Sequence, residues 1–584
     1  MEQKLEYKRH TLAHLLAAAV IEQYPDAKLT LGPAIENGFY YDIDFGEGNT
    51  PGEDDLKGLQ KSMKKLINKW TEFTHAEVTA EAARKQFAGN PYKLELIDEI
   101  ESKGELITLY TCGDFTDLCR GGHVENPKEE IATDAFKLDT IAGAYWRGDE
   151  KNQMLTRIYG LAFDTKEELE AFQKQREEAR ARDHRKLGKE LGLFTFSDTV
   201  GKGLPLYTAK GTTIRRILER FIVDEEIKRG YQHVMTPDIA KLDLYKKSGH
   251  YPHYKDSMYA PIDIDGDEFM LRPMTCPHHF ELYNSEPHSH KELPMRIGEL
   301  AKLYRYEQSG ELSGLIRVRS FCLADAHIIC KDEEQAVEQI GEALDLIEYV
   351  ASVFGLKMGL NYSYRLSLGN RNNKEKYFDN DEAWEKGESL MRELLSNREC
   401  EFVEAEDEAA FYGPKIDVQM RNVNGKEDTA FTVQYDFCMP DRFDLTYVAD
   451  DGTKKRALVV HRSSIGALER IMAFLIEHYG GNFPLWLSPT QVSIIPVADV
   501  HTEYASEVNS ALQTAGYRTE YDDSNESMGK KIRNAKKDKL PYFIVIGDKE
   551  VETKTVTLES RDTGESVILS LEELLGKFSD EVSV

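Results

Sequence analysis

The stretch from Arg305 to His327, RYEQSGELSGLIRVRSFCLADAH, carries residue types that suit a phosphate site next to a metal site. Arg305 and Arg317 supply guanidinium groups, whose planar fork matches phosphate oxygens. Phe321 supplies an aromatic face, and Asp325-x-His327 supplies a carboxylate and an imidazole that binds metals. A strand, a glycine-containing turn and a second strand would place these groups on one surface. The stretch therefore predicts a site for a nucleoside triphosphate beside a small substrate.

Two further elements extend this prediction. Cys276 lies in MTCPHH, and His461 begins HRSSIGALER, where a strand is expected to run into a helix. Cys276, His327 and His461 are much further apart than zinc-finger ligands, and spread ligands with one open position suit a catalytic or substrate-binding zinc. By residue type alone each is an ordinary buried Cys or His. No P-loop and no GxGxxG after a strand occurs, which argues against those nucleotide folds.

A second cluster lies near the N-terminus. His10 and His14, four residues apart in an apolar predicted helix, share one face of it. Cys119 and His123 are also four apart. Together the two pairs indicate a polar pocket, for which the residues leave two interpretations open. One is a tetrahedral zinc site, and the other is a metal-free hydrolytic pocket in which imidazoles move protons.

Composition limits the classes of protein to which the chain can belong. The 584 residues predict three or four domains, with 41% hydrophobic and 30% charged residues as in globular proteins. No apolar run is long enough for a membrane span, and the start resembles neither a signal nor a transit peptide. Seven scattered cysteines indicate a reducing compartment. The net charge of −29 restricts nucleic-acid binding to local basic patches.

The positioning elements follow from capping signals and periodicity. Thr165 and Glu168 predict a capping box that starts one continuous, highly charged and solvated helix reaching about residue 190. Strands and helices then alternate to about residue 486. The last segment alternates again, as an α/β domain does. Its second helix holds the basic patch: Lys530, Lys531, Arg533, Lys536, Lys537 and Lys539.

Eleven motifs in order carry a family resemblance. They are GPAIENGFYYDID, DLCRGGHV, GAYWRGD, RDHRKLGKEL, RPMTCPHH, YRYEQSGELSGLIRVRSF, DAHIIC, FYGPKID, TVQYDF, VHRSSIGALERI and PYFIVIGDKE. Over nearly its whole length the chain resembles the threonyl-tRNA synthetases, a branch of the class II aminoacyl-tRNA synthetase family. The resemblance implies a multidomain α+β protein with four parts. These are an α+β editing domain (1–163), a helical linker (164–190), an antiparallel class II sheet core flanked by helices (191–486) and an α/β anticodon-binding domain (487–584).

The resemblance also implies a role for each matching residue. For ATP, with its Mg²⁺, these are Arg305, Glu307, Arg317, Phe321, Gln434 and Arg470, of which the three arginines are catalytic. One zinc ion per subunit is implied on Cys276, His327 and His461, and threonine contacts on Asp325, Tyr412 and Met274. The implied editing residues are His10, His14, Cys119, His123, Asp117, Lys93 and Tyr41, with the metal-free interpretation favoured. The implied tRNA anticodon contacts are Asn525, Lys531, Arg533 and Glu550.

The implied activity is threonine–tRNA ligation with hydrolysis of seryl-tRNA(Thr) as a second step. A site that bonds a hydroxyl rejects valine by roughly 10⁴ or more, whereas serine, which lacks one methyl, is rejected only about 10–200-fold. The editing domain supplies the missing selectivity. The expected partners are tRNA(Thr), ATP and threonine, in the cytoplasm and without a membrane. A homodimer is expected through GYQHVMTPDI, which contains Pro237.

Several positions depart from the family pattern. The small ubiquitin-like domain that usually precedes the editing domain has no counterpart in this sequence. Leu323 and Ala324 replace polar residues and are expected to weaken the surroundings of the threonine pocket. Gly122, Ala467 and Glu559 stand where Pro, Ser and a basic residue are common. Two rival interpretations are a prolyl- or seryl-type class II enzyme, which has no use for the Cys/His/His set, and a non-catalytic paralogue.

Overall fold

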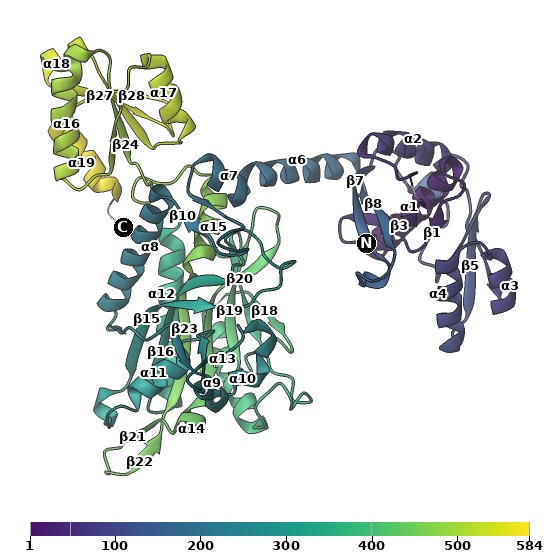
Figure 1. Cartoon of the computed structure of the whole chain (residues 1–584), viewed down its shortest axis with the longest axis horizontal. Coiled ribbons are helices and arrows are strands. Elements are labelled where there is room, and N and C mark those ends of the chain that lie inside the picture. Colours follow the sequence, from purple (N-terminus) through teal and green to yellow (C-terminus); the bar gives the residue numbers. More distant parts are fainter. Residues whose placement is uncertain (1, 47, 399, 583–584) are drawn as a thin grey trace. The chain divides into compact units, whose positions relative to one another are not determined.

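The computed structural model describes residues 2–46, 48–398 and 400–582, and Figure 1 labels its elements. These residues form two compact units that divide between Glu177 and Glu178, inside helix α6 (Lys166–Arg182). Among the described residues, no helix has the length and apolar character that a membrane span needs. The predicted domain boundaries at residues 163, 190 and 486 stay predictions.

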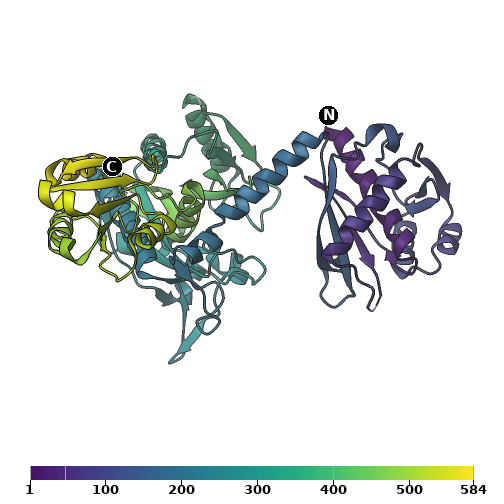
Figure 2. The ribbon, with the colours of Figure 1, turned by 90° about the horizontal axis from the view of Figure 1, so that it is seen from above.

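The first unit is built on a long helix, α1 (Glu2–Gln23), whose residues 11–20 are all buried. Figure 2 shows α1, in purple, beside strands of a sheet with the order β1-β3-β8-β7, and β2 pairs with β3. Helix α2 (Leu56–Ile67) contacts α1 through apolar residues at helical spacing. The strands are β1 (Lys28–Leu29), β2 (Ala34–Ile35), β3 (Gly38–Asp44), β7 (Phe136–Tyr145) and β8 (Met154–Ala162).

A second, three-stranded sheet of the same unit has the order β4-β5-β6. Helix α4 begins after Asn90, whose side chain accepts hydrogen bonds from the N–H groups of Tyr92 and Lys93, and Pro91 fixes its first turn. This cap sets the position of Lys93. The elements are β4 (Thr74–Val78), β5 (Ile107–Cys112), β6 (Phe115–Leu118), α3 (Ala80–Gln86), α4 (Pro91–Ser102) and α5 (Pro127–Glu130). The expected α+β fold of this part is confirmed.

The predicted capping box at the start of α6 is confirmed, and the predicted continuous helix is wrong. Thr165 Oγ1 accepts from the Glu168 N–H at 3.2 Å, and the Glu168 carboxylate accepts from the Thr165 N–H at 3.3 Å. The helix ends at Arg182, and α7 (His184–Glu190) starts anew. Asp183 causes the break because its carboxylate caps α7 through the Arg185 N–H, an alternative that Asp offers the backbone.

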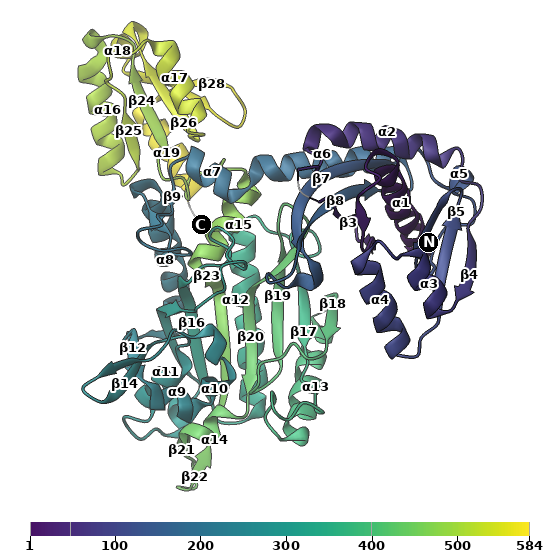
Figure 3. The ribbon, with the colours of Figure 1, turned by 45° about the vertical axis from the view of Figure 1, so that its right-hand side comes forward.

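The core of the second unit is an eight-stranded sheet with the order β11-β15-β16-β23-β20-β19-β17-β18, part of which Figure 3 shows face-on. Pairing is antiparallel except for the parallel edge pairs β11/β15 and β17/β18. The antiparallel class II core predicted from the resemblance is therefore confirmed. The strands are β11 (Gln232–His233), β15 (Met295–Tyr304), β16 (Ser320–Cys330), β17 (Tyr362–Ser367), β18 (Phe402–Ala405), β19 (Lys415–Arg421), β20 (Glu427–Asp436) and β23 (Leu458–Ala467).

Amphipathic helices flank this sheet. Helix α12 starts at an Asp332 cap and buries Ile340, Leu344 and Ile347 at helical spacing against β20 and β23. The core helices are α8 (Ala209–Lys228), α9 (Leu242–Ser248), α10 (His250–His253), α11 (Cys276–Tyr283), α12 (Glu333–Val353), α13 (Asp381–Asn397), α14 (Met439–Phe443) and α15 (Leu468–Tyr479). The remaining strands are β9 (Phe194–Thr195), β10 (Leu206–Tyr207), β12 (Ile239–Lys241), β13 (Ile262–Ile264), β14 (Asp267–Leu271), β21 (Thr446–Val448) and β22 (Lys454–Arg456).

The last part of the chain is the expected α/β domain. Its sheet has the order β25-β24-β26-β27-β28, parallel in the first three strands and antiparallel in the last two. Helix α16 (Thr502–Thr514) ends shortly before Gly516, whose left-handed φ of 89° suits the turn that follows the helix. The elements are β24 (Val492–Pro496), β25 (Thr519–Tyr521), β26 (Tyr542–Ile546), β27 (Thr555–Ser560), β28 (Ser566–Ser570), α16 (Thr502–Thr514), α17 (Met528–Lys537), α18 (Asp548–Thr553) and α19 (Leu571–Val582).

Candidate active site and hydrolytic pocket

One cavity of the core sheet gathers all twelve residues that the sequence assigned to ATP, zinc and threonine. It lies among β15, β16, β20, β23, α15 and the loop between β15 and β16, and has a volume of about 1030 Å³ when the space open to solvent is included. The residues are Met274, Cys276, Arg305, Glu307, Arg317, Phe321, Asp325, His327, Tyr412, Gln434, His461 and Arg470. Segments that are far apart in sequence thus form one site.

Three arginines approach one another in this cavity. Arg470 of α15 donates to the carbonyls of Ile316, at 3.1 Å, and of Thr429. Burial lowers the pKa of Arg470, and the positive charges of Arg305 and Arg317 lower it further. Like charges held together are unfavourable unless an anion joins them. This part of the cavity is therefore built for a polyanion.

An aromatic ring lies beside the arginines. The Arg305 guanidinium is 5.2 Å from the centre of the Phe321 ring, a cation–π distance. Glu307 follows in the same loop, where its carbonyl accepts from Arg319 Nε at 3.0 Å. A cation, a ring and a carboxylate in one place match the phosphate, base face and exocyclic amine of adenine nucleotides. The predicted ATP residues are thus close together, with the exception of Gln434.

Gln434 lies at the other end of the cavity. It pairs across the sheet with His461, and its side-chain oxygen accepts from the Tyr412 hydroxyl. The Tyr412 ring stacks on the His461 ring with centres 4.9 Å apart. Gln434 is therefore grouped with the predicted threonine residues, whereas the sequence grouped it with the nucleotide.

Cys276, His327 and His461 converge at this end, and all three are buried. His327 and His461 face each other on neighbouring strands, and Cys276 is the first residue of α11. One ligand atom of each lies within 4.8 Å of the others. Burial, with the Asp325 and Asp436 charges, raises the pKa of Cys276 well above its ordinary value. A thiol and two imidazoles at this spacing fit Zn²⁺ with a place for substrate.

Hydrogen bonds leave one nitrogen of each histidine available. His461 Nε2 lies 2.7 Å from an Asp436 carboxylate oxygen, so Nε2 carries the proton and Nδ1 keeps its lone pair. His327 Nδ1 lies 2.8 Å from Nδ1 of His279. Sequence reasoning missed both partners. The only signals were the second histidine of TCPHH and the aspartate of TVQYDF, both inside quoted motifs.

Leu323 and Ala324, the two positions on β16 that depart from the family pattern, differ in their effect on the pocket. Leu323 lines the cavity, whereas the Ala324 side chain is buried in the core cluster away from it. The Ala324 carbonyl accepts from the Ser463 hydroxyl at 3.0 Å. Only Leu323 therefore removes polarity from the pocket wall. Burial raises the pKa of Asp325, the neighbouring carboxylate, which fits a group that awaits a cationic partner.

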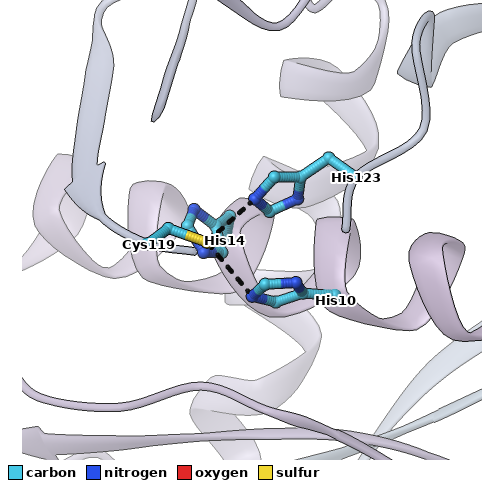
Figure 4. A group of neighbouring side chains, drawn as sticks. All are labelled: His10, His14, Cys119 and His123. Carbon is cyan, nitrogen blue, oxygen red and sulfur yellow. Dashed lines mark hydrogen bonds between the residues drawn. The ribbon is translucent and has the colours of Figure 1, made fainter. Parts of the chain in front are cut away.

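The predicted editing residues also converge. Figure 4 shows Cys119 between His10 and His123, with His14 behind. Cys119 Sγ lies 3.6 Å from His10 Nε2 and 3.3 Å from His123 Nε2. Gly122 has a φ of 84°, which proline cannot adopt, so the departure from the family proline suits this loop. The four side chains offer ligand atoms within 4.8 Å of one another, so a metal fits here as well.

Burial keeps this cluster uncharged. Burial, with the repulsion that a charge on His14 or His10 would exert, lowers the pKa of His123 to about 2, and burial also lowers the pKa of His10. Burial raises the pKa of the Cys119 thiol to about 11. At neutral pH the imidazoles are uncharged and the thiol is a hydrogen-bond donor rather than a nucleophile. The uncharged rings can accept hydrogen bonds from a water molecule or bind a metal.

A buried ion pair forms the floor of the adjoining cavity. Lys93 Nζ lies 2.5 Å from Asp117 Oδ1, and both residues are 2% exposed. The Tyr41 hydroxyl donates to the other carboxylate oxygen. His10, His14, Cys119 and this trio all line one cavity of the first unit. Of the predicted editing residues, all except His123 line this cavity.

Replacing Lys93 with methionine is expected to destabilise the first unit by about 3–5 kcal/mol, because it leaves the Asp117 charge buried without a partner. Hydrogen exchange of the full chain, followed by mass spectrometry, would show faster exchange in α4 and β6. Lys103→Met is the matched control, because its pair with Glu99 is exposed and contributes at most about 1 kcal/mol. Equal exchange in the two variants would contradict the prediction.

The basic patch of the last domain is smaller than the sequence indicated. Lys531, a member of the patch, is 6% exposed, and its Nζ donates to the Asp522 carbonyl at 2.8 Å. The Glu550 carboxylate accepts a hydrogen bond from the Thr557 hydroxyl at 2.7 Å. Lys536 is paired with Glu559 at 2.8 Å, so the departure at Glu559 neutralises part of the patch. Of the four anticodon candidates, Asn525 and Arg533 are exposed.

Three family models match the chain. The class II tRNA synthetase core domain (G, H, P, S and T) matches residues 259–479, and an anticodon binding domain matches residues 491–581. The threonyl and alanyl tRNA synthetase second additional domain matches residues 107–159. These three matches lie in the parts of the chain that hold the core cavity, the basic patch and the His/Cys cluster.

Curated relatives extend the match to the full length. Threonine–tRNA ligase of Geobacillus sp. (strain WCH70) is 48% identical over 585 residues, covering 100% of this chain and 89% of the relative. Threonine–tRNA ligase 1 of Bacillus subtilis (strain 168) is 47% identical, covering 99% and 88%. A crystal structure of the RNA binding domain of threonyl-tRNA synthetase from Cryptosporidium parvum Iowa II is 34% identical with a TM-score of 0.65, covering 68% of this chain and 98% of that one. The chain belongs to the threonine–tRNA ligase family of class II aminoacyl-tRNA synthetases.

Proposed function

We propose that the core cavity activates threonine with ATP, giving threonyl-adenylate and pyrophosphate, and that the chain then passes threonine to tRNA(Thr). The observation that carries the proposal is the single cavity that joins a cluster of arginines to a Cys/His/His set. Adenylyl transfer needs positioning and charge neutralisation more than covalent help from the protein. Both are present in this cavity.

Each residue at the nucleotide end receives one role. Arg305 binds the α-phosphate, and Arg317 binds the outer phosphates together with Mg²⁺. Phe321 and Arg470 pack on the two faces of adenine, and Glu307 accepts from its amino group. The mutual repulsion of the arginines supports this assignment, because a triphosphate relieves it. The guanidinium fork holds the phosphate in line for attack by the threonine carboxylate.

At the other end, Cys276, His327 and His461 hold one zinc ion per subunit. When bound, zinc supplies a Lewis acid for the amino and hydroxyl groups of threonine. Asp325 lies on the same strand as His327 and accepts from the substrate amino group. Around them lie Met274, Tyr412 and Gln434. This polar end discriminates by the hydroxyl group, so valine is excluded and serine is not.

The rejection of serine then requires a second site, in the first unit. We assign hydrolysis of seryl-tRNA(Thr) to its cavity, where His10, His14 and His123 act as neutral proton acceptors and Cys119 orients them. The Asp117–Lys93 pair and Tyr41 anchor the seryl group. We retain the metal-free interpretation that the family resemblance favours, in which water is the nucleophile. The family match at residues 107–159 supports the editing role.

The remaining assignments concern partners. We assign tRNA(Thr) anticodon contacts to the last domain, with Asn525 and Arg533 as the exposed contacts. A homodimer through residues 230–239 accounts for the exposure of Met235, which is 93%, and of Ile239, which is 44%. Seven free cysteines suit the reducing cytoplasm, which is the proposed location.

Amino-acid-dependent ATP–pyrophosphate exchange tests the core proposal. The purified chain is expected to contain one zinc per subunit and to exchange fastest with threonine. Serine is expected to be about 10–200-fold slower and valine roughly 10⁴-fold slower, because only valine leaves the polar groups of the site without a partner. Removal of zinc with a chelator should abolish exchange, and added Zn²⁺ should restore it. Faster exchange with proline, serine or valine would refute the proposal, and zinc-bound protein without exchange would indicate a non-catalytic paralogue.

A further inference from the structure

His279 connects a predicted zinc ligand to a buried carboxylate. It lies on α11, is fully buried and does not line the cavity. Its Nδ1 is 2.8 Å from His327 Nδ1, and its Nε2 is 3.1 Å from Glu299 Oε2. The two imidazole rings are nearly perpendicular, with centres 4.8 Å apart. A chain of hydrogen bonds therefore runs from Glu299 through His279 to His327.

Glu299 acts only as an acceptor in this chain. Besides His279, it accepts from the Thr236 N–H at 3.2 Å, the Thr236 hydroxyl at 2.8 Å and Arg272 Nη1 at 3.0 Å. Four donors around two oxygens leave no place for a carboxyl proton. Burial raises the pKa of Glu299, but the bonds from His279 and Thr236 and the Arg272 charge bring it down to about 2. His279 Nε2 therefore carries the proton of this bond.

The remaining protons then have defined positions. In the tautomer that donates to Glu299 from Nε2, His279 has a lone pair on Nδ1, which accepts a hydrogen bond. His327 must therefore donate from Nδ1, and its own lone pair is on Nε2, which becomes the available metal ligand. The opposite tautomer of His327 would direct an N–H at a metal and could not bind it.

We propose that His279, held by Glu299, is a positioning residue that fixes the tautomer and ring orientation of His327 and thereby sets the zinc affinity of the core cavity. The inference rests on the proposed zinc site. The preceding residue, His278, offers a natural comparison. It is on the same helix and is also buried, but within the described part of the chain neither of its ring nitrogens has a hydrogen-bond partner.

The test is a Zn²⁺ titration of the zinc-depleted full chain against a competing chromophoric chelator. His279→Leu is expected to lower the Zn²⁺ affinity by about 10–100-fold, the usual effect of losing such a partner. His279→Asn should remain within a few-fold of wild type, because its side-chain oxygen takes the place of Nδ1 as acceptor. His278→Leu is the matched control and should match wild type. Co²⁺ loaded in place of Zn²⁺ should show shifted visible bands in His279→Leu only.

Each result bears on one proposal. If wild type binds no Zn²⁺, the proposed zinc site is wrong. If wild type binds Zn²⁺ and His279→Leu binds it equally well, or if His278→Leu loses as much affinity, the positioning role is refuted. If His279→Leu fails to fold by circular dichroism, Glu299→Gln replaces it. That variant should weaken Zn²⁺ binding, and in the His279→Asn background it should have no further effect, because no imidazole remains for Glu299 to hold. Zn²⁺ binding that is unchanged in Glu299→Gln, or weakened equally in the His279→Asn background, would refute the inference.

Discussion

Replacing Arg470 with alanine is expected to lower kcat/KM for threonine-dependent ATP–pyrophosphate exchange by about 10²–10³-fold, the usual effect of removing one preorganised group that stabilises developing charge. Arg470 is held in place by the carbonyls of Ile316 and Thr429, so its guanidinium is preorganised. Burial and the nearby arginines lower its pKa, so binding of the triphosphate relieves an unfavourable charge. Stopped exchange assays over a range of ATP concentrations measure the change.

Two variants make this result specific. Arg470→Lys keeps the charge but not the planar fork, so an intermediate loss is expected. Arg392→Ala is the control on α13, where the arginine forms an exposed pair with Glu404, and exchange should not change. Full exchange activity in Arg470→Ala would show that the cavity is not the ATP site.

Replacing Cys119 with alanine is expected to slow clearance of seryl-tRNA(Thr) by about 10²-fold or more, while threonine activation stays at the wild-type rate. The thiol bonds both His10 and His123, so its loss frees the two rings that position the attacking water. Activation is unaffected because its residues lie in the other compact unit. Deacylation of preformed seryl-tRNA(Thr), together with the exchange assay, measures both quantities.

Cys112→Ala is the matched control. Cys112 is buried in β5 of the same unit, outside the His/Cys cluster, and its replacement should leave seryl-tRNA clearance unchanged. Unchanged clearance in Cys119→Ala would place editing elsewhere. Zinc analysis of wild type also separates the two interpretations of the pocket, because the metal-free one predicts one zinc per chain and the alternative predicts two.

Sequence determined the local elements, because their signals are local. The capping pair Thr165 and Glu168 and the apolar run of α1 act within a few residues, and both predictions are confirmed. The wrong prediction of one continuous helix in the linker also has a local cause. The charge pattern predicts that Asp183 is one more charge on a solvated helix, but its side chain caps a new helix.

Tertiary structure decided which side chains meet and in which protonation state. Spacing could not pair His327 with His279, place Gln434 beside Tyr412, or bury Lys531, because each depends on strand register and packing between distant segments. The stretch from Arg305 to His327 supplied the chemistry from residue types alone. In the folded sheet, this stretch contributes to both a nucleotide end and a metal end of the cavity. Only folding brings Arg470 to the first end and His461 to the second.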